Sequence, residues 1–549
     1  MSKSIHPRVA ILGLDGATLD LIQPWAEAGL LPNFARLMAA GARGTLHSTI
    51  HPISPQAWSS FITGKNAGKH GLYDFLVKSP GSYQFALTHG GHRRGTSLWQ
   101  YLSAAGKRVI VLNVPFTYPP EPVNGLMLSG FDAPRCDSSI ASPPELLNEI
   151  QQAVGTYFLH EMYPVGRKKA EYEEVLCAEV RNRFAVTRYL HERYDWDFFM
   201  VVVNATDLVQ HLFWAEMEDP ASPYQETILH VYQAVDAALG DWWNLFGEQV
   251  NFLVISDHGA GPIRKTIYLN EWLQQAGFLT FRSEQQSTLE RVTAQGLNQL
   301  RMRLKQSLPR GVKDWLKQKI PDIRNRVESW LQTSAIDWSR TEAFAGGNFG
   351  NIYINLEGRE AQGIVPPDDY PAVVAQIREA LTSLRDPETG ELLVEAVYHR
   401  DELYVGPYRE LAPDLLVVWR DYAYFVYPTL GGNAGTLFGP APQEDATEFI
   451  HSGTHRVNGI LLATGPDLCA TQIEGAHITD LAPTLLHLYG LPVPDDMDGR
   501  VLQELLARKR PVIYCPADVP EQGDGAVPPG QLEETPEIVE RLRSLGYLE

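Results

Sequence analysis

Four short apolar runs in this chain are each bordered by residues that can bind a metal ion. Three runs are followed by aspartate or histidine, and a histidine precedes the fourth. Short apolar runs between polar turns are typical of strands buried in a parallel sheet. Because ligands collect at the carboxyl ends of such strands, we expect the bordering residues to form one two-metal site. The runs are residues 9–14, 198–203, 252–256 and 459–464, and the bordering residues are Asp15, Asp207, His211, Asp257, His258 and His455.

Length and charge limit the classes of protein to consider. At 549 residues the chain is too long for one minimal core, which predicts two or three structural units. The formal net charge is −20, from 46 basic and 66 acidic residues, and this argues against a protein that binds nucleic-acid duplexes. An anionic small molecule stays compatible with that charge, because bound metal ions can dominate the local field.

The N-terminus and the cysteines bear on location. Residues 1–8 lack the basic region and long apolar core of a signal peptide. No window reaches about 18 consecutive apolar residues, so no transmembrane helix is expected. Cys136, Cys177, Cys469 and Cys515 lie far apart and form no C-x-x-C pair, as expected of thiols in a reducing compartment. These features predict a cytoplasmic protein.

Strand and helix patterns alternate along most of the chain. A helix is expected over residues 30–38, ending at Gly41, a strand over residues 107–113, and a long helix over residues 171–194. This alternation predicts an α/β fold with a mostly parallel central sheet. The expected divisions are a catalytic core at 1–282 and 340–510, an insertion at 283–339, and a C-terminal loop and short helix at 511–549.

The predicted insertion is both amphipathic and basic. Residues 301–326 contain nine Lys or Arg and two Asp, and apolar residues recur at helical spacing. A pair of solvated helices would explain this composition. The alternative is a helical cap over the core that attracts anionic substrates or makes peripheral contact with an anionic membrane surface.

Two of the bordering pairs have spacings that suit a shared ion. Asp207 and His211, four residues apart, would lie on one face of a helix. Asp257 and His258 can reach one ion only where their strand ends, and the following glycine allows that turn. Each pair also has a simpler explanation, as chance surface residues or as a turn. The case for His455, in a Gly/Thr loop, depends on the need of the other ligands for a further nitrogen donor.

Ser54 is the candidate nucleophile. It suits a helix N-cap, with Pro55 at the first helical position, and a hydroxyl there lies at the positive end of the helix. A serine that serves only as a helix cap needs no metal ion. A nucleophilic serine must lose its proton near pH 7, and zinc, for comparison, lowers the pKa of bound water from about 15.7 to about 7. We therefore interpret Ser54 together with the metal ligands.

As a set, these motifs resemble the alkaline phosphatase superfamily, and within it the type I phosphodiesterase/nucleotide pyrophosphatase group. Asp15 lies at the position of the family's first metal aspartate, Ser54 at that of its Ser or Thr nucleophile, and His70-Gly71 at that of a following His-Gly. The resemblance implies an alkaline-phosphatase-like three-layer sandwich with a mostly parallel central sheet and a helical cap insertion. The remaining family ligands are matched by Asp207, His211, Asp257, His258 and His455.

The resemblance also implies two divalent metal ions and a covalent intermediate. Ser54 would attack phosphorus in line, and the resulting phosphoserine would then be hydrolysed. The family usually holds zinc, and manganese is an alternative because carboxylate and imidazole ligands accept it. One ion would be held by Asp207, His211 and His455, and the other by Asp15, Asp257 and His258.

The sequence departs from the group at the residue that contacts phosphate. Nucleotide pyrophosphatases have an asparagine shortly after the His-Gly pair, and Phe75 occupies that position here. The phosphate donor is therefore expected elsewhere, with Lys65, Asn66 and backbone N–H groups as candidates. Nucleotide specificity does not follow from the resemblance for this reason.

Other catalytic motifs are absent or incomplete. The glycine-rich stretch at 64–70 lacks P-loop spacing, no G-x-S-x-G elbow follows a suitable strand, and the first strand lacks a full dinucleotide fingerprint. The sulfatase branch is disfavoured because Trp58 occupies its arginine position. The phosphoglycerate-mutase branch is disfavoured because its serine has a different local context.

These observations predict a metal-dependent hydrolase of phosphoric esters, acting on phosphodiesters or nucleotide-pyrophosphate-type substrates. A phosphomonoesterase or phosphotransferase would use the same site. A binding protein stabilised by its metal ions is the alternative without catalysis, but structural zinc sites are usually rich in cysteine, and every expected ligand here is Asp or His.

Overall fold

The computed structural model describes residues 7–159, 168–282, 336–427, 437–441 and 451–517. The basic insertion lies outside these residues except for its last positions, and so does most of the C-terminal segment expected at 511–549. Within the described part of the chain, no helix is long and apolar enough to cross a membrane.

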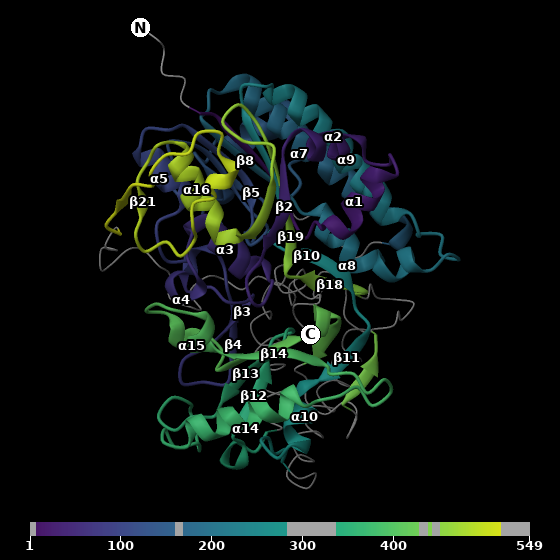
Figure 1. Cartoon of the computed structure of the whole chain (residues 1–549), viewed down its shortest axis with the longest axis vertical. Coiled ribbons are helices and arrows are strands. Elements are labelled where there is room, and N and C mark those ends of the chain that lie inside the picture. Colours follow the sequence, from purple (N-terminus) through teal and green to yellow (C-terminus); the bar gives the residue numbers. More distant parts are fainter. Residues whose placement is uncertain (1–6, 160–167, 283–335, 428–436, 442–450, 518–549) are drawn as a thin grey trace, which may run out of the picture.

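The described residues include a nine-stranded central sheet (Figure 1). All pairings among β1, β5, β6, β8 and β9 are parallel, as are those between β2 and β20. The carboxyl ends of β1, β8 and β9, in the middle of the sheet, are level, because Leu14 pairs with Val203 and Gly13 with Ile255. In spatial order the strands are β20 (Gln472–His477), β2 (Ala42–His47), β19 (Asn458–Thr464), β9 (Asn251–Ile255), β1 (Val9–Leu14), β8 (Phe198–Val203), β5 (Val109–Val114), β6 (Gly125–Ser129) and β7 (Ala141–Ser142).

One expected parallel strand is antiparallel. The run at residues 459–464 forms β19, which is antiparallel to both of its neighbours, β2 and β9. An apolar run does not reveal strand direction, because a strand buried on both faces is apolar in either direction. The reversal brings the amino end of β19 to the edge where the parallel strands end.

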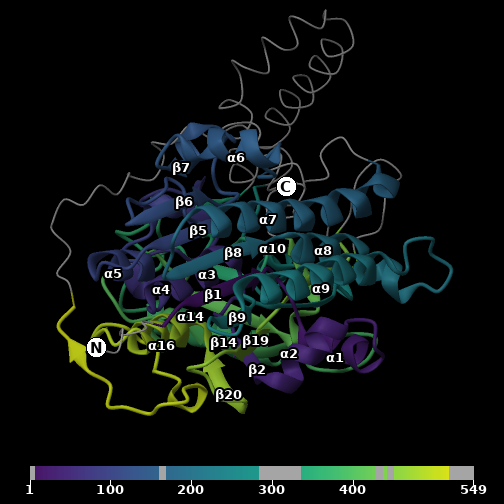
Figure 2. The ribbon, with the colours of Figure 1, turned by 90° about the horizontal axis from the view of Figure 1, so that it is seen from above.

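Helices cover both faces of the sheet and complete a three-layer sandwich (Figure 1 and Figure 2). Alternate residues of β1 explain the two layers, since Ala10 and Leu12 pack into one buried cluster and Val9 and Ile11 into the other. The first cluster is covered by α1 (Leu19–Glu27), α2 (Pro32–Ala40), α6 (Leu146–Val154), α7 (Tyr172–Arg193), α8 (Ala205–Glu218) and α9 (Thr227–Phe246). The second is covered by α3 (Ser54–Thr63), α5 (Leu98–Ala104) and α16 (Leu481–Leu488).

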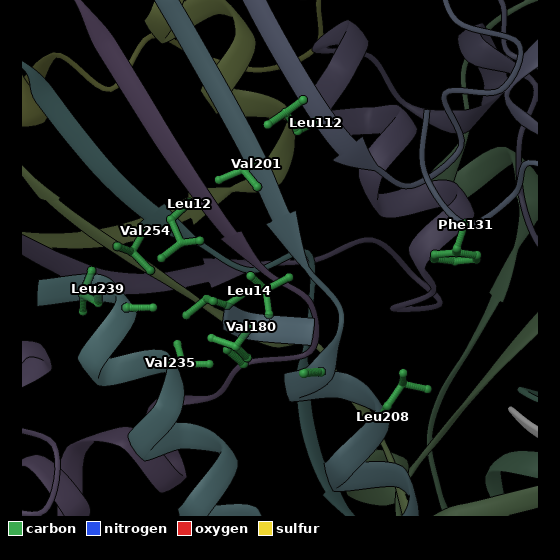
Figure 3. Close-up of a cluster of buried hydrophobic side chains, with 14 of the residues drawn as sticks. Leu12, Leu14, Leu112, Phe131, Val180, Val201, Leu208, Val235, Leu239 and Val254 are labelled. Atoms are coloured by element: carbon green, nitrogen blue, oxygen red, sulfur yellow. The ribbon is translucent and has the colours of Figure 1, made fainter. Parts of the chain in front are cut away.

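Close packing of these helices fixes the sheet rigidly. Figure 3 shows Leu12, Val201 and Val254 of the strands facing Val235 and Leu239 of α9, and all five are buried. Such interiors tolerate little movement, so the strand ends are held in fixed relative positions. The predicted helices at 30–38 and 171–194 correspond to α2 and α7 within a few residues.

A second, four-stranded sheet packs below the carboxyl edge of the first (Figure 1). It has its own buried cluster, which includes side chains of α10 (Leu269–Gln275) and α14 (Tyr370–Thr382). The domain division expected from the sequence included this sheet in the catalytic core. Its strands in spatial order are β12 (Ala343–Gly346), β13 (Asn351–Ile354), β15 (Leu415–Trp419) and β14 (Val394–His399).

Several short strands and helices lie outside the two larger sheets. A hairpin of β3 (Leu76–Lys78) and β4 (Phe85–Leu87) follows α4 (Ala67–His70), and α15 (Arg400–Leu403) follows β14. The remaining pairings are β10 (Gly259–Pro262) with β18 (Gly453–Arg456), β11 (Lys265–Tyr268) with β16 (Tyr424–Tyr427) and β17 (Phe438–Pro440), and β21 (Val493–Pro494) with β22 (Tyr514–Cys515).

Candidate metal centre

The carboxyl edge of the central sheet gathers all seven residues expected to act together. Asp15 follows β1, Asp257 and His258 follow β9, and α8, which carries Asp207 and His211, starts two residues after β8. His455 was expected in a loop, but it lies in strand β18, which pairs with β10 directly after His258. Ser54 is the first residue of α3, which packs on the face of the sheet opposite to α8. All seven are buried: Asp15, Ser54, Asp207, His211, Asp257, His258 and His455.

One group of ligand-type atoms surrounds the carboxylate of Asp207. Its Oδ1 lies 3.3 Å from Nε2 of His211 and 3.6 Å from Nε2 of His455. The i,i+4 spacing on α8 produces the first contact, and the β10–β18 pairing produces the second. These three residues could hold one metal ion.

A second group meets at His258. Its Nε2 lies 3.3 Å from Oδ2 of Asp257, 3.6 Å from Oδ1 of Asp15 and 3.3 Å from the Ser54 hydroxyl. Donor atoms of Asp15, Asp207 and His258 also lie within 4.8 Å of one another. Asp207 therefore belongs to both groups, although it was expected in only one of them.

Backbone carbonyls determine which nitrogen each histidine presents to the centre. Nδ1 lies 2.8 Å from the Gly453 oxygen in His211, 3.0 Å from the Gly259 oxygen in His258 and 2.7 Å from the Pro52 oxygen in His455. A carbonyl only accepts, so Nδ1 carries the proton in all three rings. In the neutral rings, each Nε2 then points a lone pair into the centre, as metal-binding histidines require.

The interior of the centre fits cations. The Nε2 atoms of His211 and His455 are 3.0 Å apart, so with both Nδ1 atoms protonated either a proton or a metal ion must lie between them. Asp15 Oδ1 and Asp257 Oδ2 are buried and accept no hydrogen bond. Among the described residues, no lysine or arginine pairs with these carboxylates or with Asp207. Among the described basic residues only histidines approach these carboxylates, and bound cations would balance their buried charge.

Burial and mutual repulsion shift the titration of the acidic residues. Burial, and then the charges of Asp257 and Asp207, raise the pKa of Asp15 well above its ordinary value. Burial and Asp207 raise the pKa of Asp257 to about 7. Burial acts in the same direction on Asp207, but the hydrogen bond and charge of His211, together with the charges of His455 and His258, outweigh it and lower the pKa. A bound divalent cation would favour the ionised form of all three carboxyls.

Comparison with known proteins identifies the family. The family model for type I phosphodiesterase/nucleotide pyrophosphatase matches residues 9–439. The chain belongs to this family. Membership makes it an enzyme that hydrolyses phosphoric esters. His455 lies beyond the matched residues, so its place in the centre is seen only in the fold.

Two solved structures and one curated protein are similar to this chain. Phosphonoacetate hydrolase from Sinorhizobium meliloti 1021 is 14% identical, with a TM-score of 0.51, over 88% of this chain and 96% of that protein. Murine ectonucleotide pyrophosphatase/phosphodiesterase 5 is 14% identical, with a TM-score of 0.49, over 91% and 100%. A 2,3-bisphosphoglycerate-independent phosphoglycerate mutase from Laribacter hongkongensis is 40% identical over only 75 residues, which is 14% of either chain.

Ser54 does not cap α3, contrary to the sequence analysis. The N-cap is Ile53, and Ser54 is the first helical residue without a side-chain cap bond. The hydroxyl is turned instead toward Nε2 of His258. The alternative explanation, that Ser54 serves only as the N-cap of this helix, is therefore wrong.

The His-Gly pair of the family stabilises the helix that carries Ser54. His70 accepts the Leu72 N–H at Nδ1, at 3.2 Å, which leaves its Nε2 proton to be donated to Ser60 Oγ of α3 at 3.0 Å. Burial, then Arg93 and Lys65, lower the pKa of His70 to about 3, so the ring is neutral. Gly71 ends α4 with φ +80°, a conformation that favours glycine.

The residues suggested as phosphate donors are bound to other partners. Lys65 forms an ion pair with Asp496, and Asn66 donates to Asp498 at 2.8 Å. Phe75, at the family's asparagine position, is buried against Phe116. The first N–H groups of α3, which have no partner within the helix, are the donors left beside Ser54.

An aromatic wall beside the centre was not found from the sequence. Phe349, in the turn between β12 and β13, lies between His51 and His455, with ring centroids 5.6 Å from each. Tyr422 is 6.4 Å from Phe349 and 5.9 Å from His51. Burial lowers the pKa of His51 to about 3, so the wall is uncharged. The only signal in the sequence is the glycine-rich turn at 346–350.

A small pocket opens next to this wall, between α3 and the second sheet. Its polar lining includes His51, Gln56, Asp74, Asn351 and Tyr404. Asp74 accepts from the Phe75 N–H at 2.6 Å and from Asn351 at 3.2 Å. Burial nevertheless raises the pKa of Asp74 to about 7.

The substitution Asp74→Asn is expected to change how stability depends on pH. The folded protein holds this proton more tightly than the unfolded chain, so the stabilisation is complete below about pH 4 and is lost as pH rises through 7. Above pH 7 the variant should exceed wild type in free energy of unfolding by about 4 kcal/mol. Urea unfolding of both proteins from pH 4 to 8 measures the difference. Parallel curves would contradict the shifted pKa.

Proposed function

We propose that this protein hydrolyses phosphodiesters with Ser54 as nucleophile at a centre for two divalent ions. The observation that supports the proposal is the convergence of three inward-facing Nε2 atoms and three carboxylates at one buried centre, with the hydroxyl of Ser54 in contact with His258. Such a set is difficult to explain as structural, because it leaves buried acceptors unsatisfied in the absence of cations. The proposed ligands are Asp15, Asp207, His211, Asp257, His258 and His455.

The ligand types favour zinc, with manganese as the alternative. When bound, such ions supply Lewis-acid stabilisation of phosphoryl oxygens and lower the pKa of a nearby hydroxyl. The chain contributes the geometry. Rigid strand ends fix the carboxylates, carbonyl acceptors orient the three histidines, and α3 presents Ser54 with its first N–H groups toward an anion.

In this mechanism Ser54 carries the phosphoryl group between two steps. Its Oγ forms a bond to phosphorus as the bond to the first alcohol breaks, and water then releases the phosphate monoester from the serine. Burial of Ser54, which is 3% exposed, limits the access of water before substrate binds.

The charge around the centre favours diesters over monoesters. A monoester carries close to two negative charges at pH 7, and a diester carries one. Lys65, which was expected as a phosphate donor, is paired with Asp496, so its charge is already balanced. The wall formed by Phe349 and His51 is uncharged, which suits a second ester group better than a further anionic oxygen.

Turnover of paired substrates tests this function. Purified protein is stripped with a chelator, reloaded with Zn²⁺ or Mn²⁺, and assayed with bis-p-nitrophenyl phosphate, p-nitrophenyl phosphate and a nucleoside 5′-p-nitrophenyl phosphate. We expect a higher kcat/KM for the diesters. Faster turnover of the monoester would support a phosphomonoesterase, and no turnover with either metal would contradict the proposal.

A further inference from the structure

Two buried asparagines connect the ends of three adjacent strands behind the proposed centre. Asn113 lies in β5, Asn204 follows β8 and Asp15 follows β1, and these strands are neighbours in the sheet. Nδ2 of Asn204 donates to Oδ2 of Asp15 at 2.8 Å, and Nδ2 of Asn113 donates to Oδ1 of Asn204 at 2.7 Å. The exposed fractions of the two asparagines are 0% and 3%.

A backbone atom determines the direction of this relay. Nδ2 of Asn113 also donates to the Val202 carbonyl oxygen at 2.9 Å. A carbonyl oxygen can only accept, so the amino end of Asn113 must face β8. Asn204 must then present its oxygen to Asn113, and its own amino group is left for Asp15. The Val202 carbonyl thus fixes the orientation of the Asn113 amide, and Asn113 in turn fixes that of the Asn204 amide.

The backbone at Asn113 is shaped for this role. Its φ is +58°, and the pairing of β5 with β6 is irregular between Leu112 and Val114. Asparagine is among the few residues besides glycine that enter this left-handed region readily. A strand irregularity of this kind redirects a side chain from its regular alternation. Asn113 therefore combines a tolerated backbone conformation with an amide that can act on the neighbouring strand.

The relay distinguishes the two oxygens of Asp15. Oδ2 is occupied by Asn204, whereas Oδ1 accepts no hydrogen bond and lies 3.6 Å from Nε2 of His258. We propose that Asn113 and Asn204 are positioning residues that direct Oδ1 of Asp15 to a divalent ion. This inference depends on the proposed function, because it assumes that Asp15 is a metal ligand. Partners that orient a metal ligand typically change metal affinity by about 10–100-fold when replaced.

Metal affinity of an isosteric variant tests the relay. Asn204→Asp keeps the side-chain shape but replaces the donor to Asp15 with a carboxylate. We expect its affinity for Zn²⁺, measured by competition with a chromophoric chelator on stripped protein, to fall by about 10–100-fold. Excess Zn²⁺ should restore most of kcat with the diester. Asn113→Gly, which suits the positive φ and removes the amide, should shift the affinity in the same direction by a smaller factor.

The opposite end of the sheet offers a matched control. Asn251 begins β9, is buried, and donates to Oδ2 of Asp467 at 3.0 Å, as Asn204 does to Asp15. Asn251→Asp makes the same chemical change far from the centre and should leave Zn²⁺ affinity within about twofold of wild type. An unchanged affinity in Asn204→Asp and Asn113→Gly, or an equal loss in Asn251→Asp, would overturn the relay. If wild type itself binds no Zn²⁺ or Mn²⁺, the proposed function fails as well.

Discussion

Replacing Ser54 by alanine is expected to reduce kcat/KM for a phosphodiester by at least about a thousandfold. The Ser54 hydroxyl lies 3.3 Å from Nε2 of His258. Alanine has no hydroxyl there to accept the phosphoryl group. Binding of the metal ions should persist, since the six proposed ligands remain. Steady-state kinetics with the diester, together with metal analysis of the same sample, measure both effects.

The same helix provides a close control for this variant. Ser60 is also a buried serine of α3 whose hydroxyl contacts a histidine, at 3.0 Å from Nε2 of His70. Ser60→Ala should lower the free energy of unfolding by about 1 kcal/mol, as expected for one hydrogen bond, and leave kcat/KM within a few fold. If Ser54→Ala keeps wild-type turnover, or if both variants lose activity equally, the covalent route through Ser54 is wrong.

Asp207→Asn is expected to have the second-largest effect, because this carboxylate belongs to both groups of ligand atoms. The amide has no negative charge and offers one acceptor oxygen instead of two. We expect the protein to lose most of its bound metal on dialysis and kcat/KM to fall by at least about a hundredfold. Metal content after dialysis and kinetics at several Zn²⁺ concentrations measure the loss.

A buried aspartate without a ligand role serves as the control for Asp207→Asn. Asp236 of α9 accepts from the backbone N–H groups of Asn33 and Phe34, at 3.2 and 2.8 Å, and thereby anchors the start of α2. Asp236→Asn should reduce stability without changing metal content. Full metal occupancy in Asp207→Asn would show that the centre does not depend on this carboxylate, and the two-ion arrangement would have to be abandoned.

The sequence predicted the parts of the fold that depend on local pattern. The runs before Asp15 and Asp257 form strands because they are apolar throughout and end in polar residues. The i,i+4 pair of Asp207 and His211 lies on a helix as its spacing required. Strand direction is not encoded in such a run, and for this reason β19 was expected to be parallel. The separate sheet that includes β13 escaped notice because its short strands have the same apolar pattern as the core.

The candidate site was predictable where chemistry and spacing coincide and not where only tertiary packing decides. His455 had no local signal, and its position results from pairing with a strand about 200 residues earlier in the chain. Phe349 comes from a different sheet, so no motif connects it to Ser54. Asn113 and Asn204 lie at strand ends that were recognised, but their roles depend on which strands are neighbours. Neighbour order follows from the whole topology and is not a property of any single segment.

The pairing of β10 with β18 also affects when the enzyme can become complete during its synthesis. Five of the six proposed ligands lie within the first 258 residues, and the sixth is residue 455. A ribosome makes proteins from the amino end at about 5–20 residues per second, so the last ligand emerges at least about ten seconds after the others. A nascent chain in that interval already contains Ser54 and three carboxylates but lacks the imidazole that closes the centre. Loading of the proposed metal centre would therefore have to follow the synthesis of most of the polypeptide.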